Sequence, residues 1–85
     1  MSQKPLPPLS PQARALVPGR SYEHYKKLRY KLIGVARHSE TLEEMVIYQQ
    51  LYGDGSIWVR PLGMFCEQVE VEGVWQPRFT CVEED

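Results

Sequence analysis

The chain has 85 residues, of which 42% are hydrophobic and 25% charged, so it makes at most one small globular domain. No apolar run approaches the roughly 18 residues of a membrane span, and the N-terminus lacks the apolar stretch of a secretory signal, so we expect a cytoplasmic protein with no membrane partner. A formal net charge of −1 argues against a non-specific nucleic-acid binder, which needs a basic field over the whole protein.

Charge is divided unevenly along the sequence. Residues 1–40 contain eight Lys or Arg and two Glu, a net +6, whereas residues 41–85 contain two Arg and nine Asp or Glu, a net −7. In one domain the two halves interleave, so we expect most charges to pair across it or to face solvent. The alternative is a basic surface patch made by Lys26, Lys27, Arg29 and Lys31.

Proline dominates residues 1–19, which hold five of the seven prolines. Because Pro lacks a backbone N–H and restricts the residue before it, we expect residues 1–17 to form an arm, in places polyproline II. Two P-x-x-P patterns, at 5–8 and 8–11, resemble SH3 ligands but lack the basic anchor residue. The simpler interpretation is an ordinary loose or packed arm, with residues 1–16 dispensable for folding. Residues 18–82 then form one small domain, followed by an acidic tail at 83–85.

The first half of this domain predicts two strands. Residues 19–25 form a short strand, 26–27 a turn, and 28–38 a long alternating strand that Gly34 allows to bend. In this long strand we expect one face to be formed by Leu28, Tyr30, Leu32, Gly34 and Ala36.

The segment after the long strand is ambiguous. Residues 41–44 fit a helical capping box, but the following Val46, Ile47 and Tyr48 favour a strand. An Asp-Gly loop at 53–56 then leads to a strand-like run at 57–60, and two such runs around a loop indicate a hairpin. We therefore predict a loop at 39–44 and a strand at 45–52.

The last third predicts a helical turn and two more strands. Pro61 suits the start of a helical turn that runs to Phe65, and strands at 67–72 and 74–82 flank Gly73. About five short strands with one helical turn indicate a mainly β fold, specifically a small SH3-like barrel. Its expected core comprises Leu32, Ala36, Val46, Tyr48, Ile57, Val59 and Phe65.

Cys66 and Cys81 are too few for a disulfide framework. Neither is at a zinc-ligand spacing from His24 or His38, so we expect no metal and no cofactor. We interpret both cysteines as small apolar fillers near the C-terminal strands.

Several motifs together resemble the bacterial domain of unknown function 1653 family. The match runs from about Pro18 to Val82 and implies a small stand-alone bacterial domain, an SH3-type barrel without an established activity or ligand. Lys27 departs from the pattern, which has Gly after the Tyr-Lys pair. The motifs are Tyr22-x-His24-Tyr25-Lys26, Gly34-Val35-Ala36-Arg37-His38-Ser39-Glu40-Thr41, Leu51-Tyr52-Gly53-Asp54, Trp58-Val59-Arg60-Pro61, Met64-Phe65 and Pro77-Arg78-Phe79.

Two features bear on function. His38, Ser39 and Glu40 contain the residue types of a catalytic triad, but neighbours in an extended chain point to opposite sides and cannot line up. Aromatic residues make up 11% of the chain and are expected mainly in the core, with a surface binding groove as the alternative.

Three classes of function follow from these features. The first is a non-catalytic binding module for a protein, peptide or nucleic acid, the second a self-assembling subunit that dimerises through an edge strand, and the third a small hydrolase. Arg60 and Arg78 each predict either an ion pair with Glu40, Glu67 or Glu70, or a binding site for a carboxylate or phosphate. The predicted polar site comprises His24, His38, Ser39, Glu40, Arg60 and Arg78.

Overall fold

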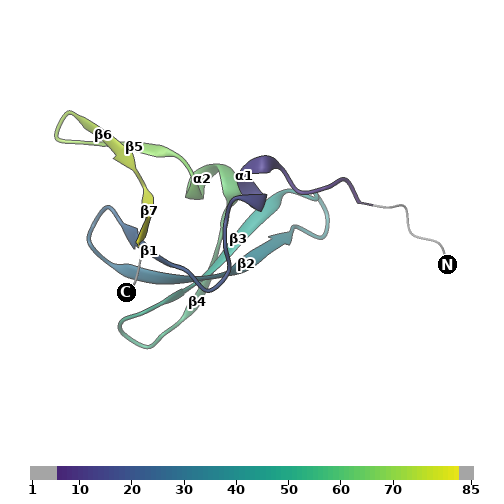
Figure 1. Cartoon of the computed structure of the whole chain (residues 1–85), viewed down its shortest axis with the longest axis horizontal. Helices are drawn as coiled ribbons and strands as arrows, with labels where there is room; N and C mark the ends of the chain where they lie inside the picture. Colours follow the sequence, from purple (N-terminus) through teal and green to yellow (C-terminus); the bar gives the residue numbers. More distant parts are fainter. Residues whose placement is uncertain (1–5, 83–85) are drawn as a thin grey trace.

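The computed structural model describes residues 6–82, and within them the elements follow one another as short strands and two single-turn helices (Figure 1). In chain order they are α1 (Pro11–Arg14), β1 (Ser21–His24), β2 (Arg29–Arg37), β3 (Glu44–Gln50), β4 (Ile57–Pro61), α2 (Leu62–Phe65), β5 (Gln68–Val71), β6 (Val74–Pro77) and β7 (Phe79–Val82).

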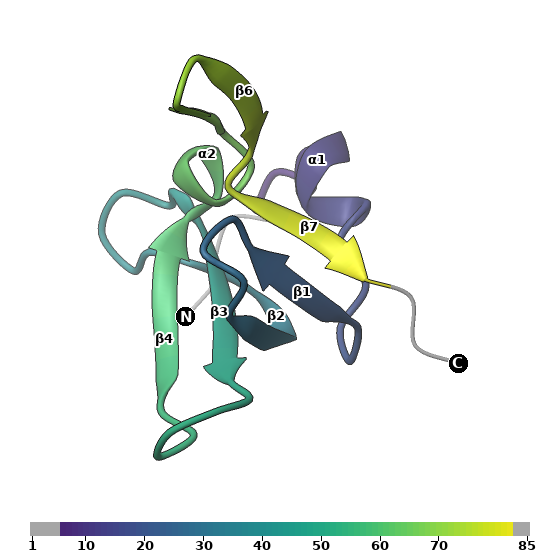
Figure 2. The same ribbon diagram turned by 90° about the vertical axis from the view of Figure 1, so that its left-hand side faces the viewer.

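Five strands form one antiparallel sheet in the order β4-β3-β2-β1-β7, and β5 and β6 form a separate two-stranded sheet. Figure 2 shows this β5–β6 hairpin standing beyond α2, away from the larger sheet. The mainly β prediction is confirmed. The SH3-like barrel is not, because β4 and β7 are the two ends of the sheet and no closed barrel is found among the described residues.

The hairpin predicted around the Asp-Gly loop is confirmed. β3 pairs with β4, and Gly53 and Gly55 in the loop both take the positive φ that glycine tolerates. The predicted strand at 74–82 is instead two strands. The strand is interrupted between Pro77 and Phe79, after which β7 crosses over to pair with β1.

A bulge in β2 overturns the single alternating face predicted for this strand. Leu32 pairs with Tyr48 and Gly34 with Ile47, so Ile33 is the extra residue. One inserted residue moves the side chains of all later residues in the strand to the opposite face of the sheet. Leu32 is therefore buried before the bulge, whereas Val35 packs on the core after it and Ala36 is only half-buried.

The core lies on one face of the sheet beneath α1 and α2. Of the expected core residues, Leu32, Val46, Tyr48 and Phe65 are buried. Ile57 and Val59 were predicted wrongly, since both are exposed on β4, an edge strand with a neighbour on one side only. Both cysteines are also exposed, so they do not fill the core. The full buried apolar cluster is Ala13, Tyr22, Leu32, Val46, Tyr48, Leu62, Phe65 and Phe79.

The described part of the N-terminal segment is not a loose extended arm. Ser10 caps α1 by accepting the Ala13 N–H on its hydroxyl at 3.2 Å, and Pro11 occupies the first turn of the helix. Ala13 is 2% exposed, and Leu9 and Leu16 pack against the same core. The Ser10 N–H also donates to Glu44 Oε2 at 2.7 Å and holds the pKa of Glu44 below its ordinary value. This segment is thus tied to β3. The first P-x-x-P pattern begins outside the described residues, and the second ends in α1.

Candidate functional site

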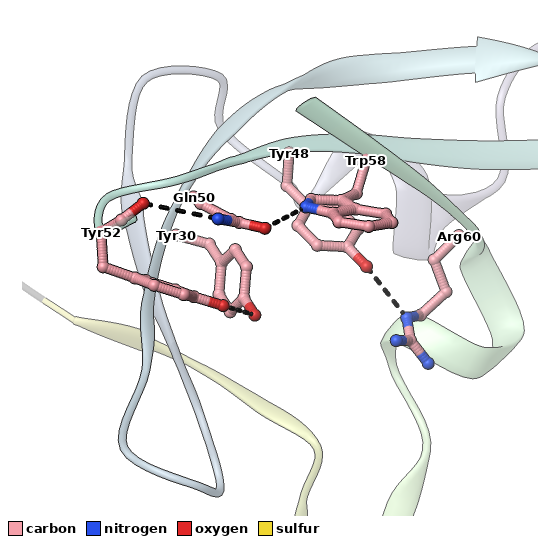
Figure 3. A pocket seen from close by; sticks show the side chains of 6 residues that line it. All are labelled: Tyr30, Tyr48, Gln50, Tyr52, Trp58 and Arg60. Carbon is pink, nitrogen blue, oxygen red and sulfur yellow. Dashed lines mark hydrogen bonds between the residues drawn. The ribbon is translucent and has the colours of Figure 1, made fainter. Parts of the chain in front are cut away.

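A pocket of about 240 Å³ opens where β2, β3 and β4 meet the loop after β3 (Figure 3). Four of its six lining residues are aromatic, and one is a cation. The lining consists of Tyr30, Tyr48, Gln50, Tyr52, Trp58 and Arg60.

The strand register brings these side chains to one face. Tyr30 lies opposite Gln50 in the β2–β3 pair, and Tyr48 lies opposite Trp58 in the β3–β4 pair. Because directly opposed residues share a face and every second residue of a strand returns to it, Arg60 follows Trp58 onto the same side. Tyr52 reaches the pocket from the loop between β3 and β4.

Hydrogen bonds fix the rim of the pocket. The Tyr30 and Tyr52 hydroxyls lie 2.5 Å apart, and the Trp58 indole Nε1–H donates to Gln50 Oε1 at 2.5 Å (Figure 3). The Gln50 amide also donates to the Tyr52 carbonyl oxygen at 3.4 Å. These bonds hold Tyr52 and Trp58 in place, although both side chains are exposed.

Edge-to-face ring contacts connect the pocket to the core. The Tyr30 ring centroid lies 5.2 Å from that of Tyr48 and 5.5 Å from that of Tyr52. Tyr48 in turn lies 5.4 Å from Phe79, which stacks on Phe65. Burial and the bond to Tyr52 raise the pKa of Tyr30 to about 12, so the Tyr30 phenol stays protonated at neutral pH. The pocket wall is therefore an extension of the hydrophobic core.

Arg60 supplies the charge of the pocket. Its Nε–H donates to the Tyr48 hydroxyl at 3.1 Å, and its guanidinium carbon lies 5.9 Å from the Phe79 ring centroid. Within residues 6–82 no carboxylate comes into ion-pair range of Arg60, which is half-buried. The ion pair predicted for Arg60 is therefore not formed in the described part of the chain.

Arg78, by contrast, does form the predicted ion pair. Its Nε–H and its terminal nitrogen both donate to Glu67 Oε1, the first at 3.0 Å. The two backbones are also bonded, since the Arg78 N–H donates to the Glu67 carbonyl at 3.0 Å. Arg78 thus anchors the start of β7 to the residue before β5.

His24 lies beside the pocket at the end of β1. Its ring centroid is 5.0 Å from that of Phe79 and 6.5 Å from that of Tyr30. Burial, followed by the positive charges of Arg78, Arg60 and Lys26, lowers the pKa of His24 below 6.5, so the imidazole is neutral at neutral pH. Its Nδ1 accepts the Lys26 N–H at 3.2 Å. The structure therefore brings His24 and Arg60 to the Phe79 ring and places Arg78 near enough for its charge to act on His24.

The other three predicted site residues lie elsewhere. His38, Ser39 and Glu40 occupy the exposed turn between β2 and β3, at the opposite end of these strands from Tyr30 (Figure 1). His38 is eight positions along the chain from Tyr30, which corresponds to about 25 Å in an extended strand. The His38 Nδ1 accepts the N–H groups of Glu40 and Thr41 at 3.1 and 3.3 Å, so the imidazole stabilises the turn. Ser39 makes no hydrogen bond to it within the described chain, and no nucleophile–base pair is assembled.

The predicted polar site contained one of the six pocket residues, Arg60, because the aromatic side chains were assigned mainly to the core and a surface groove was kept only as the alternative. The signal that would have found them is the register of the predicted hairpin, which places Tyr48 opposite Trp58 of the edge strand β4, on the same face as Arg60. In the described part of the chain, no group of three or more His, Cys, Asp or Glu is placed to hold a metal ion. None of its helices is long and apolar enough to cross a membrane.

Comparison with known proteins gives two matches. The model of a family described as protein of unknown function (DUF1653) matches residues 20–81. A crystal structure of a protein of the same family from Bordetella bronchiseptica is 36% identical, covers 82% of this chain and 91% of its own, and superposes with a TM-score of 0.73. Among curated proteins, no match is found.

Proposed function

The chain belongs to the DUF1653 family, whose function is unknown, and we propose that it is a non-catalytic binding module for a partner that presents a planar or apolar group beside a carboxylate or phosphate. Such a group occurs in peptides, proteins and nucleic acids. The pocket between Tyr52 and Arg60 is the proposed site.

The observation that carries this proposal is the unpaired charge of Arg60. A half-buried guanidinium loses part of its hydration and is normally compensated by a carboxylate. Within the described part of the chain, its Nε is bonded to the neutral Tyr48 hydroxyl, and its two terminal nitrogens, which lie on the side of the guanidinium away from Tyr48, have no hydrogen-bond partner (Figure 3). A planar guanidinium in this state matches the two oxygens of a carboxylate or phosphate.

The walls decide what accompanies the anion. Trp58 is 52% exposed and Tyr52 is 36% exposed, so both offer ring surface to a ligand. Stacking on such rings favours a flat or apolar group. At about 240 Å³ the pocket is smaller than drug-sized sites of roughly 300–1,000 Å³, and it admits a single side chain or base.

Calorimetric titration with two matched pairs of small compounds tests this function. N-acetyl-phenylalanine and thymidine 5′-monophosphate carry the anion, and N-acetyl-phenylalaninamide and thymidine lack it. We expect each anion to bind more tightly than its neutral analogue, by roughly tenfold for a charge-assisted hydrogen bond. The better of the two anions identifies the carboxylate or the phosphate as the natural group.

Arg60→Gln should abolish that difference without weakening the neutral compounds. Arg29→Gln is the matched control, because Arg29 forms an ion pair with Glu23 at 3.1 Å and, as the neighbour of Tyr30 in β2, lies on the opposite face of the strand. Equal binding of charged and neutral compounds, or the same loss in both variants, would contradict the proposal.

A further inference from the structure

β4 is an edge of the five-stranded sheet that carries one wall of the pocket. It pairs with β3 on one side, and on its other side no strand of residues 6–82 pairs with it. Edge strands are usually protected by charged residues, a bulge or a covering segment. β4 has exposed apolar residues instead, with Ile57 62% and Val59 58% exposed.

The register fixes which backbone groups are available at this edge. The Gln50 N–H donates to the Ser56 carbonyl at 2.9 Å, so these two residues form a hydrogen-bonded pair next to β4. Hydrogen-bonded pairs alternate along an antiparallel ladder, so the Trp58 and Arg60 backbones face β3 while those of Ile57 and Val59 face outward. The outward position after them is Pro61, which has no N–H to leave unpaired.

The same alternation sorts the side chains. Trp58 and Arg60 lie on the pocket face, and Ile57 and Val59 lie on the other face of the sheet. A strand added along this edge would place every second side chain beside Arg60 and the remaining ones beside Ile57 and Val59. The first set meets an uncompensated positive charge, and the second meets an apolar surface.

We propose that β4 accepts an extended segment of a partner protein as a sixth, antiparallel strand, with acidic side chains on the pocket face beside Arg60 and apolar side chains beside Ile57 and Val59. This inference rests on the proposed function for the charge at Arg60, and it names a peptide carboxylate as the anion. Main-chain hydrogen bonds then supply affinity, and the alternating acidic and apolar residues supply specificity. All existing pairs in the sheet are antiparallel, so the added strand continues the pattern.

The peptide acetyl-Val-Glu-Val-Glu-Val-amide is the test ligand, measured by NMR titration of the full chain. Residues opposite Ile57 and Val59 turn their N–H groups toward β4, and residues opposite Trp58 and Arg60 turn them away. N-methylation of the central Val should therefore weaken binding about tenfold or more, while N-methylation of either Glu should leave it within about twofold. Any other pattern overturns the strand addition.

Two protein variants test the same geometry from the other side. Val59→Pro removes an outward N–H without breaking a bond to β3 and is a substitution that edge strands tolerate. Val59→Ala removes the side chain but keeps the N–H. We expect Val59→Pro to lose at least tenfold in affinity and Val59→Ala to lose clearly less. Equal losses would overturn the proposal, and the N-methylated peptides decide the matter if Val59→Pro does not fold.

The controls separate this inference from the proposed function. If Arg60→Gln weakens N-acetyl-phenylalanine but N-methylation of the central Val has no effect, the pocket stands and the added strand is wrong. If the strand pattern holds but the parent chain binds the Glu and Gln forms of the peptide equally, or Arg60→Gln keeps a preference for the Glu form, the charge assignment is wrong. β5 has the same alternation in Val69, Glu70 and Val71, so a second copy is the competing occupant. If the free chain sediments as a dimer and Val59→Pro dissociates that dimer, the occupant of the β4 edge is a second copy and the partner peptide is wrong.

Discussion

Arg60 and Arg78 differ in what surrounds them, although their sequence contexts are similar. Each precedes or follows a proline at the end of a strand, and each was expected to find a carboxylate. Arg78 finds Glu67, whereas Arg60 finds only the Tyr48 hydroxyl and the Phe79 ring within the described chain. Sequence could not distinguish the two, because the choice depends on which glutamate the chain crossing from β6 to β7 brings near. That difference makes Arg60 a residue of the proposed site and Arg78 an anchor of the fold.

Lys27 is a residue-scale case in which local strain can be measured. Its φ of 72° is a left-handed conformation, which costs an L-residue about 1 kcal/mol and glycine almost nothing. The family resemblance led us to expect Gly here. The ion pair of Lys27 with Glu23 spans 3.8 Å with the Lys side chain 81% exposed, so it contributes little.

We therefore expect Lys27→Gly to raise the melting temperature by several degrees, equivalent to about 0.5–1 kcal/mol. Lys26→Gly is the control, because Lys26 lacks a positive φ and a glycine there only adds freedom to the unfolded chain. Thermal unfolding followed by circular dichroism measures both variants. A Lys27→Gly melting temperature at or below that of the parent would show that the turn is not strained.

At the scale of elements, the hydrophobic periodicity predicted where most strands lie. It did not predict which strand faces are covered by other elements. β3 and β4 were expected as a hairpin, and both form. The prediction that Ile57 and Val59 are buried was wrong. Alternation shows which residues share a face of the strand, but it does not show whether another element packs on that face. The prediction of a single alternating face on β2 was wrong for another reason. The bulge at Ile33 arises from the pairing of β2 with β3, which the sequence of β2 alone does not specify.

The helix α1 makes a second element-scale claim, that the N-terminal segment stabilises the fold. Ala13→Asp would bury a carboxylate among apolar side chains at a cost of several kcal/mol, a large part of the stability of a small domain. Ala15→Asp is the matched control, because Ala15 is the exposed C-cap of the same helix. Urea unfolding should show a strongly destabilised Ala13→Asp and a nearly unchanged Ala15→Asp. Equal midpoints would mean that residues 1–16 are dispensable after all.

At the scale of the whole molecule, sequence predicted a mainly β domain but not the open sheet or the separate hairpin. A closed barrel requires its end strands to pair, and β4 and β7 do not pair within residues 6–82. The site lies at one end of this open sheet, because Trp58 and Arg60 belong to the end strand β4. Aromatic richness and the two arginines could be read from the sequence. The convergence of four aromatic residues and Arg60 on one pocket follows from the register of three strands, which no local sequence pattern contains.

The most direct test of the binding pocket is an NMR titration that follows the indole Nε1–H signals of the two tryptophans. Trp58 lies in the pocket wall and donates to Gln50, whereas Trp75 is 65% exposed on the β5–β6 hairpin and serves as an internal control. On addition of N-acetyl-phenylalanine or thymidine 5′-monophosphate, we expect the Trp58 signal to shift until saturation, the Trp75 signal to stay in place, and Arg60→Gln to abolish the shift. Saturation in which both indoles move equally, or in which Trp58 stays in place, would contradict the assignment of this pocket.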